Sequence, residues 1–285
     1  MTTAIASLAD VVRGFPRPGP GRRGDPGLFG PASLAWRINR ESVLLLGGGR
    51  ALLMQIAHPL VAAGVADHSD FRAEPFDRLW RTVDRALTVI FGDARQWRDA
   101  VDRVNELHEH VFGSRRGVPY SALDPELLLW VHATLVDSSI AAYDAFVRPM
   151  PETVRERYYL EMRRMGTAFG VPDELHPPTY DAFVAYMDAT IAGLDITDEC
   201  RDVARTVLTP PAPAVVMPAG LLGGLASVGL LPPRIREGLR LRWNRGTEAA
   251  FRAMAASLRG IVPLVPARVR YWPHARLADR RMQAG

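Results

Sequence analysis

Cysteine, lysine and long uncharged stretches are scarce or missing in this chain of 285 residues. The single cysteine, Cys200, excludes an internal disulfide and a cysteine-based metal cage, and it is typical of a buried thiol in a reducing compartment. There is no lysine, so the 35 basic residues are all arginines, against 31 acidic residues and with a net charge of +4. Because no dense basic run precedes the C-terminal tail, this balance indicates an arginine-rich solvated surface and no nucleic-acid partner.

The sequence also lacks a run of about 20 clean apolar residues that would suit a membrane-spanning helix. The nearest stretch, residues 206–233, carries no charge, but prolines interrupt its first half. We expect a buried loop and a helix over a pocket here; the alternative is a segment that dips into a membrane surface. Asp10 and Arg13 follow a short apolar run and make a poor secretory signal. We therefore expect a cytoplasmic protein, with peripheral membrane contact as the alternative.

Strand patterns are missing as well, because β-branched runs nowhere alternate with period two. Apolar residues recur at helical spacing instead. The sequence predicts an all-α protein whose single large domain of about ten helices encloses an apolar cavity for a cofactor or substrate. The expected boundaries are an extended Gly/Pro-rich arm over 1–32, the helical domain over 33–270, and a frayed tail over 271–285.

Aspartates mark the beginnings of three helices. Asp77 is the expected N-cap of a helix over 77–91, and Asp93 that of a helix over 93–112. Asp124 is followed by proline, a good first helical residue, and opens a helix that is almost uncharged. A helix that is apolar all round is buried, so we expect the third helix to be central.

A glycine triplet at 47–49 does not fit a phosphate-binding loop. No strand precedes it, and it lacks both the Walker lysine and the G-x-G-x-x-G spacing. We expect these glycines to allow a helix kink or close packing against a flat ligand. Pro59 should end the helix that follows them, since the residue before a proline resists helical geometry.

Four of the seven histidines lie in the helices between residues 50 and 113. His108 and His110 are two residues apart and point in nearly opposite directions, so a regular helix does not bring both to one metal. His108 is the inward candidate, because it shares a helix face with three apolar residues: Val104, Leu107 and Val111. A neutral imidazole on a buried helix face is what a haem iron requires as its proximal ligand.

Other histidines offer alternatives to His108. His132 lies in an even more apolar helix and is the second candidate, as a ligand or as a base that lines the pocket. His58, His68 and Asp70 form an alternative set for a non-haem metal site, although neither HExxH nor ExxH spacing supports it. For any lone histidine of an apolar helix, a satisfied core residue is the competing interpretation.

Arg78, Arg81 and Thr82 form a second group, spaced i, i+3 and i+4, so they project from one side of a helix. Two guanidiniums on one helix face repel each other unless anions lie between them. They are therefore either surface arginines beside Asp77 and Asp84 or a functional pair. A functional pair would bind porphyrin propionates or stabilise negative charge on bound dioxygen, with a hydrogen bond from Thr82.

Several blocks succeed one another in an order that resembles the latex-clearing proteins, the rubber oxygenases that form a family with the mycophenolic-acid-pathway oxygenase. The blocks are GGGRALLMQIAHPLVAAGVADHSDF, DRLWRT, LHEHVFG, Tyr120, DPELLLWVHATL and ERYYLE. The family's His-x-x-Val-x-Gly motif falls on His108. Its Arg-x-x-Lys-Thr element falls on Arg78, Arg81 and Thr82, with arginine where the rubber oxygenases have lysine.

The resemblance implies an all-helical, haem-b-dependent oxygenase that acts with dioxygen on an apolar substrate, isoprenoid or lipid-like. His108 would ligate the iron, and Arg78, Arg81 and Thr82 would line the distal side. His68 would be the base in place of the family's catalytic glutamate. Two alternatives remain open: a non-catalytic carrier or sensor of a hydrophobic ligand, and the non-haem metal enzyme.

Overall fold

Helices make up nearly all of the regular structure in residues 18–68, 75–209 and 217–283, which are the residues that the computed structural model describes. Fourteen α-helices lie in this part of the chain, and eleven of them have ten residues or more. The sheet found there has two strands, β1 (Phe112–Arg115) and β2 (Val118–Ser121), which pair antiparallel as a hairpin. The prediction of an all-α protein is confirmed, apart from this hairpin.

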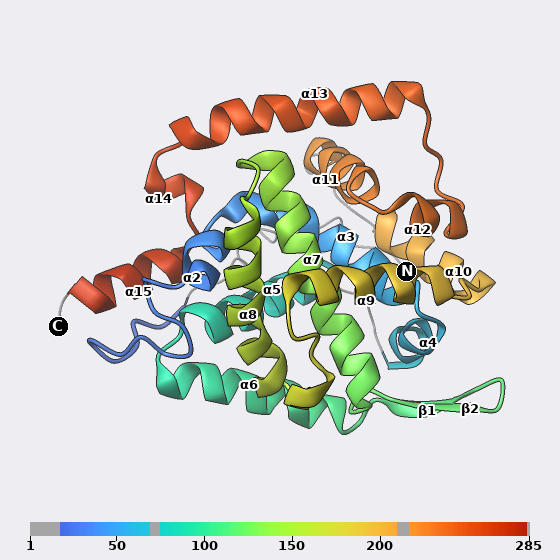
Figure 1. The fold of residues 1–285 in the computed structure, drawn as a ribbon, viewed down its shortest axis with the longest axis horizontal. Helices are drawn as coiled ribbons and strands as arrows, with labels where there is room; N and C mark the ends of the chain where they lie inside the picture. The colour runs from blue at the N-terminus through green and yellow to red at the C-terminus, as the bar shows by residue number, and fades with distance from the viewer. Residues whose placement is uncertain (1–17, 69–74, 210–216, 284–285) are drawn as a thin grey trace, which may run out of the picture.

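Short connections join most of the helices, so that neighbours in the chain are often neighbours in space (Figure 1). The α-helices are α2 (Leu34–Asn39), α3 (Leu45–Ile56), α4 (Pro59–His68), α5 (Pro75–Phe91), α6 (Ala94–His108), α7 (Pro125–Phe146), α8 (Glu152–Ala168), α9 (Tyr180–Gly193), α10 (Asp198–Leu208), α11 (Met217–Gly229), α12 (Pro233–Gly238), α13 (Arg245–Ile261), α14 (Ala267–Arg270) and α15 (Pro273–Gln283). Three 3₁₀ turns accompany them: η1 (Ser42–Leu44), η2 (Asp173–Leu175) and η4 (Val262–Leu264).

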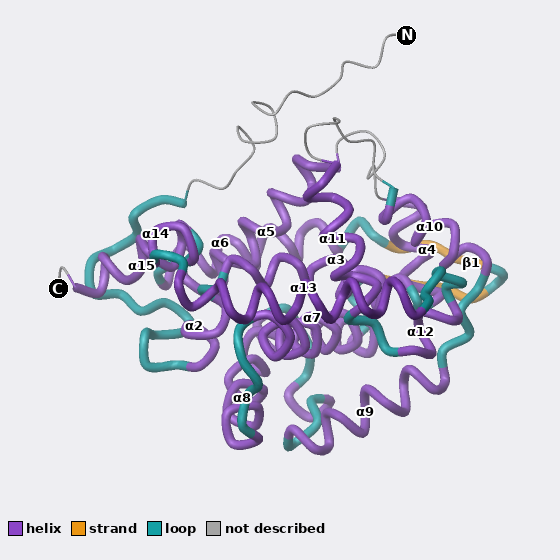
Figure 2. Tube along the Cα trace, turned by 90° about the horizontal axis from the view of Figure 1, so that it is seen from above, coloured by secondary structure: helices purple, strands orange, loops and turns teal. Residues whose placement is uncertain are grey.

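The central helix is α7, as its nearly uncharged sequence predicts. Asp124 caps it by accepting hydrogen bonds from the backbone N–H groups of Glu126 and Leu127. Helices α3, α8 and α13 all pack against it. Figure 2 shows α13 lying over α7, with α8 and α9 together on one side of α7, toward the bottom of the view. The core therefore forms around one apolar helix, which the flanking helices cover on several sides.

Glycines let α3 lie unusually close to its two neighbours. A Cβ added to Gly47 would lie 2.8 Å from the Cβ of Ala142 on α7, and one on Gly49 would lie 2.0 Å from Oγ of Ser227 on α11. Gly47 and Gly49 therefore allow close packing against the neighbouring helices α7 and α11, whereas Gly48 is exposed and has no such contact. Packing against a flat ligand stays a prediction.

We expect Gly49→Ala to lower the free energy of unfolding by about 1–3 kcal/mol, because the new methyl group overpacks the contact with Ser227. Gly48→Ala is the matched control in the same helix, since nothing lies within 4 Å of its added Cβ. This control should gain about 0.5–1 kcal/mol from helix propensity. Urea unfolding of both variants measures the difference. Equal effects would show that α3 and α11 are not packed this closely.

Pro59 separates α3 from α4, as predicted from its effect on the preceding residue. The helical segments on either side of the break, Ser42–Ile56 and Pro59–His68, are bent by 106° relative to each other. Within the described part of the chain, no single helix is long and apolar enough to cross a membrane. Taken together, the two segments of this bent pair are long and apolar enough to do so, by length and composition alone.

The uncharged stretch over 206–233 is only partly buried. Its helix α11 packs Ala226 and Ser227 into the core, but Leu221 near its beginning is 71% exposed. Residues 210–216 lie outside the described residues. The prediction of a buried helix is therefore wrong for the first turns of α11 and correct for its second half.

The C-terminal segment is a packed helix, so the prediction of a frayed tail is wrong for residues 273–283. Helix α15 buries Ala275, Ala278 and Arg281. The Arg281 guanidinium donates to the carbonyls of Asp25 in the N-terminal arm and Phe91 at the end of α5. The polar sequence of this segment does not predict the contact, because the partner is an arm from the opposite end of the chain.

Candidate functional site

Helix α6 carries the predicted iron ligand in its last turn. Asp93 caps the helix by accepting hydrogen bonds from the backbone of Arg95 and Gln96, as predicted. The helix ends at His108, four residues earlier than expected, because the chain turns there into β1. His108 therefore lies where α6 meets the hairpin.

The inward face of α6 changes from apolar to polar along its length. Ala100 and Val101 are buried, and Asn105 and His108 continue the same face one and two turns later. The Oδ1 atom of Asn105 and the Nδ1 atom of His108 are both buried and have no hydrogen-bond partner in the described residues. Leu107, which we expected on this face, is 51% exposed. His108 is thus inward, while Leu107 is not.

Burial lowers the pKa of His108, so its imidazole is neutral near pH 7. A neutral imidazole has a lone pair on one ring nitrogen and a proton on the other. The site therefore offers a metal-binding nitrogen in a packed setting, which is the chemistry that an axial ligand needs.

Helices α5 and α6 pack side by side as an antiparallel pair joined at Gly92 and Asp93 (Figure 1). The first turns of α5 therefore lie at the same end of the pair as the last turn of α6. Arg81 and Thr82 are on these turns, and both side chains are exposed. The side chain of Arg78 lies outside the described residues.

The predicted cap of α5 is wrong, because the helix begins at Pro75 and Asp77 lies inside its first turn. The start of α5 extends two residues beyond the sequence pattern, since proline is well tolerated in a first helical turn. Arg78 and Thr82 both lie within α5, so their i, i+4 spacing still applies to one helix.

His68 is held at the hairpin. It is exposed at the end of α4, where its Nε2 lies 3.0 Å from the carbonyl oxygen of Phe112 and its ring meets the edge of Tyr120. The neighbouring Asp67 accepts a hydrogen bond from the Tyr120 hydroxyl at 2.6 Å and pairs with Arg115. The carboxylate closest to His68 in the chain is therefore already engaged.

The alternative metal set is only partly described. Asp70 lies outside the described residues, and in the residues that are described no group of three His, Cys, Asp or Glu side chains is arranged to hold a metal ion. His58 is half-buried with an unpaired Nδ1. Burial lowers its pKa, and the charge of Asp124 opposes that effect.

We expect Tyr120→Phe to destabilise the hairpin anchor and to change its dependence on pH. The Tyr120 hydroxyl, with help from Arg115, lowers the pKa of Asp67. A lowered pKa in the folded state stabilises the fold above the unfolded value of about 3.9, and this contribution is lost as the pH falls through the folded value. At pH 7 the variant should therefore lose about 1 kcal/mol, as for one partly exposed hydrogen bond.

Urea unfolding of wild type and Tyr120→Phe between pH 7 and pH 3 measures this effect. The difference between the two proteins should shrink toward the acid end, as the pH falls toward the lowered pKa of Asp67 in the wild type. A difference that stays constant over this range would mean that the hydroxyl does not act through Asp67.

His132 is buried in α7 and faces another histidine. Its ring lies edge-on to His176, with ring centroids 5.7 Å apart, and its Nε2 is buried without a partner in the described segments. Burial, followed by the charge of His176, lowers the pKa of His132 to about 3. The absence of a side chain at Gly166 of α8 makes space for the two rings, because a Cβ there would lie 2.5 Å from Cε1 of His176.

His176 was missed by the sequence analysis. It lies after η2 in a proline-rich turn, where helical spacing gives no signal. The geometry thus gives His132 a neutral, interior partner, and it gives no contact between His132 and His108.

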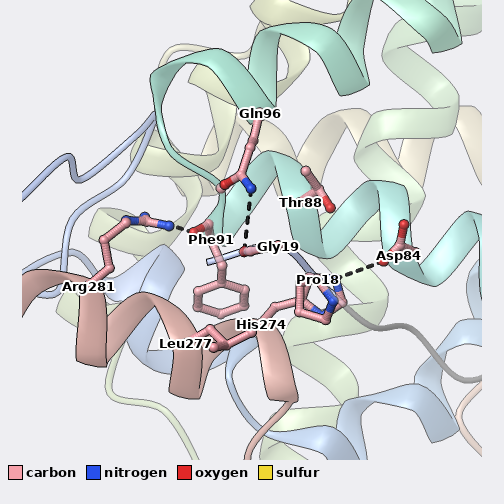
Figure 3. A pocket seen from close by; sticks show the side chains of 10 residues that line it. Pro18, Gly19, Asp84, Thr88, Phe91, Gln96, His274, Leu277 and Arg281 are labelled. Atoms are coloured by element: carbon pink, nitrogen blue, oxygen red, sulfur yellow. Dashed lines mark hydrogen bonds and ion pairs between the residues drawn. The ribbon is translucent and has the colours of Figure 1, made fainter. Parts of the chain in front are cut away.

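Two hollows lie elsewhere in the fold, one between the N-terminal arm, α5, α6 and α15 and one between α6 and α8. Figure 3 shows a cavity of ≈ 170 Å³ between the N-terminal arm, α5, α6 and α15, where Nε2 of His274 lies 2.9 Å from Asp84 and Arg281 donates to Phe91. A groove of ≈ 480 Å³ lies between α6 and α8, beside Trp97. Neither hollow is lined by a side chain that the sequence analysis assigned to the site.

Comparison with known proteins gives matches over most of the chain. The family described as "ER-bound oxygenase mpaB/B'/Rubber oxygenase, catalytic domain" matches residues 36–260. Two relatives, each described as an uncharacterized protein, come from Mycobacterium bovis and Mycobacterium tuberculosis. Each is 29% identical over 229 residues, which cover 76% of this chain and 88% of the relative. No solved structure matches.

Proposed function

The chain belongs to the mpaB/rubber oxygenase catalytic-domain family, and from this premise we propose that it is a haem-b-dependent oxygenase. Its substrate would be apolar, isoprenoid or lipid-like, and its oxidant dioxygen. The observation that carries the proposal is His108, a neutral imidazole on the inward face of α6 whose Nδ1 is buried without a partner in the described residues. Haem would supply the activation of dioxygen, and His108 would hold its iron.

Arg81 and Thr82 fit a role in binding and charge stabilisation. Both lie on the turns of α5 that share one end of the α5–α6 pair with His108. A guanidinium is charged at any ordinary pH and is a very poor iron ligand, so Arg81 would donate hydrogen bonds to propionates or to reduced oxygen. Arg78 would act in the same way from one turn earlier. The chain has no lysine at all, which excludes a lysine cap on the iron.

The missing carboxylate leaves His68 as the proposed base. Asp67 would be a poor substitute, because Tyr120 and Arg115 already occupy its two oxygens. A carboxylate whose pKa is lowered is a weaker base than an ordinary one, which further disfavours Asp67 for this role. His132 would stay neutral in the interior and line the apolar region, since its pKa lies far below neutrality.

Oxygen uptake is the test that separates this proposal from its competitors. The protein, expressed with a supply of haem, is mixed with squalene or another polyisoprenoid, and dioxygen consumption and oxygenated products are measured together. An oxygenase consumes dioxygen in step with product. A carrier retains the substrate unchanged. The absence of lysine in the chain, and of a free carboxylate beside His68 in the described residues, would favour a carrier. Iron without porphyrin in elemental analysis would favour the non-haem alternative and end the haem proposal.

A further inference from the structure

Two buried polar atoms on the inward face of α6 have no hydrogen-bond partner in the described residues, and the residues that carry them are three apart in the chain. They are Oδ1 of Asn105, a hydrogen-bond acceptor, and Nδ1 of His108, which donates in one neutral tautomer. Residues three apart on a helix are neighbours, with Cβ atoms about 5–6 Å apart. A buried polar atom without a partner is destabilising, so two complementary ones in adjacent turns favour rotamers that join them.

The direction of helical side chains brings the two groups toward each other. Side chains on a helix lean toward its N-terminus, so the His108 ring leans over the turn that carries Asn105. In that turn, the backbone carbonyls of Asn105 and Leu107 already accept from the N–H groups of Glu109 and His110. The side-chain Oδ1 of Asn105 is a buried acceptor within one turn of His108 that has no partner in the described residues.

We propose that Asn105 positions His108 by accepting a hydrogen bond from its Nδ1–H through the side-chain carbonyl. The inference rests on the proposed function, because it concerns how the imidazole is presented to iron. A proton held on Nδ1 leaves the lone pair on Nε2, which fixes both the tautomer and the orientation of the ring. Asn105 itself touches neither iron nor substrate.

The first test uses the haem-free protein and does not depend on the proposed function. Nitrogen NMR of the imidazole ring reports which nitrogen of His108 carries the proton. Wild type should show the Nδ1–H tautomer, and Asn105→Leu should lose that preference. Asn105→Asp, which keeps an acceptor at the same reach, should restore it. Glu106→Gln, on the exposed neighbouring position, is the matched control and should leave the tautomer unchanged.

An Asn105→Leu protein with the wild-type tautomer would overturn the proposal. Circular dichroism checks that each variant keeps its helical content. If Asn105→Leu fails to fold, Asn105→Asp still decides, because a charged acceptor must strengthen the Nδ1 hydrogen bond and shift the ring nitrogen signals. Unchanged ring signals in Asn105→Asp would equally reject the assignment.

The second test uses the haem-loaded protein. Asn105→Leu should weaken haem affinity by about 10- to 100-fold, as is usual when the partner of a ligating histidine is lost. The iron–histidine stretching band of the reduced protein should fall in frequency in Asn105→Leu and rise in Asn105→Asp. If wild type has no such band, the proposed function fails while the tautomer result stands. If the band is present but insensitive to both substitutions, His108 ligates iron and the role of Asn105 fails.

Discussion

His108→Ala is expected to remove the Soret band of the haem-loaded protein, while the helical content measured by circular dichroism stays at the wild-type level. The imidazole of His108 is neutral and faces inward from α6, so its loss removes the proposed iron ligand. Its position in the last turn of α6, where the helix gives way to the hairpin, limits the effect on the fold. The expected change is a loss of bound haem.

His110→Ala is the matched control for this experiment. His110 is two residues along the chain, exposed and outside α6, so its variant should keep the wild-type spectrum. Free imidazole added to His108→Ala should restore part of the band by occupying the space that the side chain vacates. An unaltered spectrum in His108→Ala, or equal losses in both variants, would show that His108 is not the iron ligand. The proposed role of His108 would then be rejected.

The parts of this fold that local sequence signals control were predictable. Asp93 and Asp124 cap their helices because an aspartate side chain satisfies the first free N–H groups of a helix wherever the following residues are helical. The burial of α7 follows from its composition, since a long helix with few charges and apolar residues on most of its surface must be covered. Cys200 is a buried free thiol, as its solitary occurrence indicated.

Features that depend on distant partners were not predictable. The burial of Arg281 depends on carbonyls of the N-terminal arm and of α5, and nothing in the tail's own polar sequence indicates them. Leu107 is exposed in the last turn of α6, although helical spacing places it near the buried Ala100, because what covers a helix end depends on distant segments. The hairpin escaped detection because its strands are only four residues long.

In the candidate site, too, local sequence signals were predictable and contacts between distant segments were not. Helical spacing identified His108 as the inward histidine, and the packing agrees. Spacing alone did not reveal Asn105, since a polar residue on an amphipathic helix is ordinarily read as solvated; only its buried, unpaired Oδ1 marks it. His176 needed the fold for the same reason, because it meets His132 across the interior from a proline-rich turn.

We expect Arg50→Leu to be the most destabilising substitution of those considered, with a loss of about 3–5 kcal/mol in the free energy of unfolding. Arg50 is 4% exposed, and its guanidinium joins three segments of the core. It pairs with Asp137, donates to Oγ of Ser138 at 2.7 Å, and donates through Nε to the carbonyl of Leu230 at 2.8 Å. Leucine fills much of the volume but leaves the partly buried carboxylate of Asp137 and the carbonyl of Leu230 without the donors that Arg50 supplies.

Urea unfolding of Arg50→Leu beside Arg252→Leu separates burial from charge pairing. Arg252 also pairs with a carboxylate, that of Glu248, but its side chain is 77% exposed, so its loss should cost only about 0–1 kcal/mol. Adding Asp137→Leu to Arg50→Leu should recover part of the loss, because the unpaired carboxylate then disappears together with its partner. Equal losses in the two single variants would mean that the Arg50 ion pair is solvated. The link that it makes between α3, α7 and the end of α11 would then contribute no more than a surface contact.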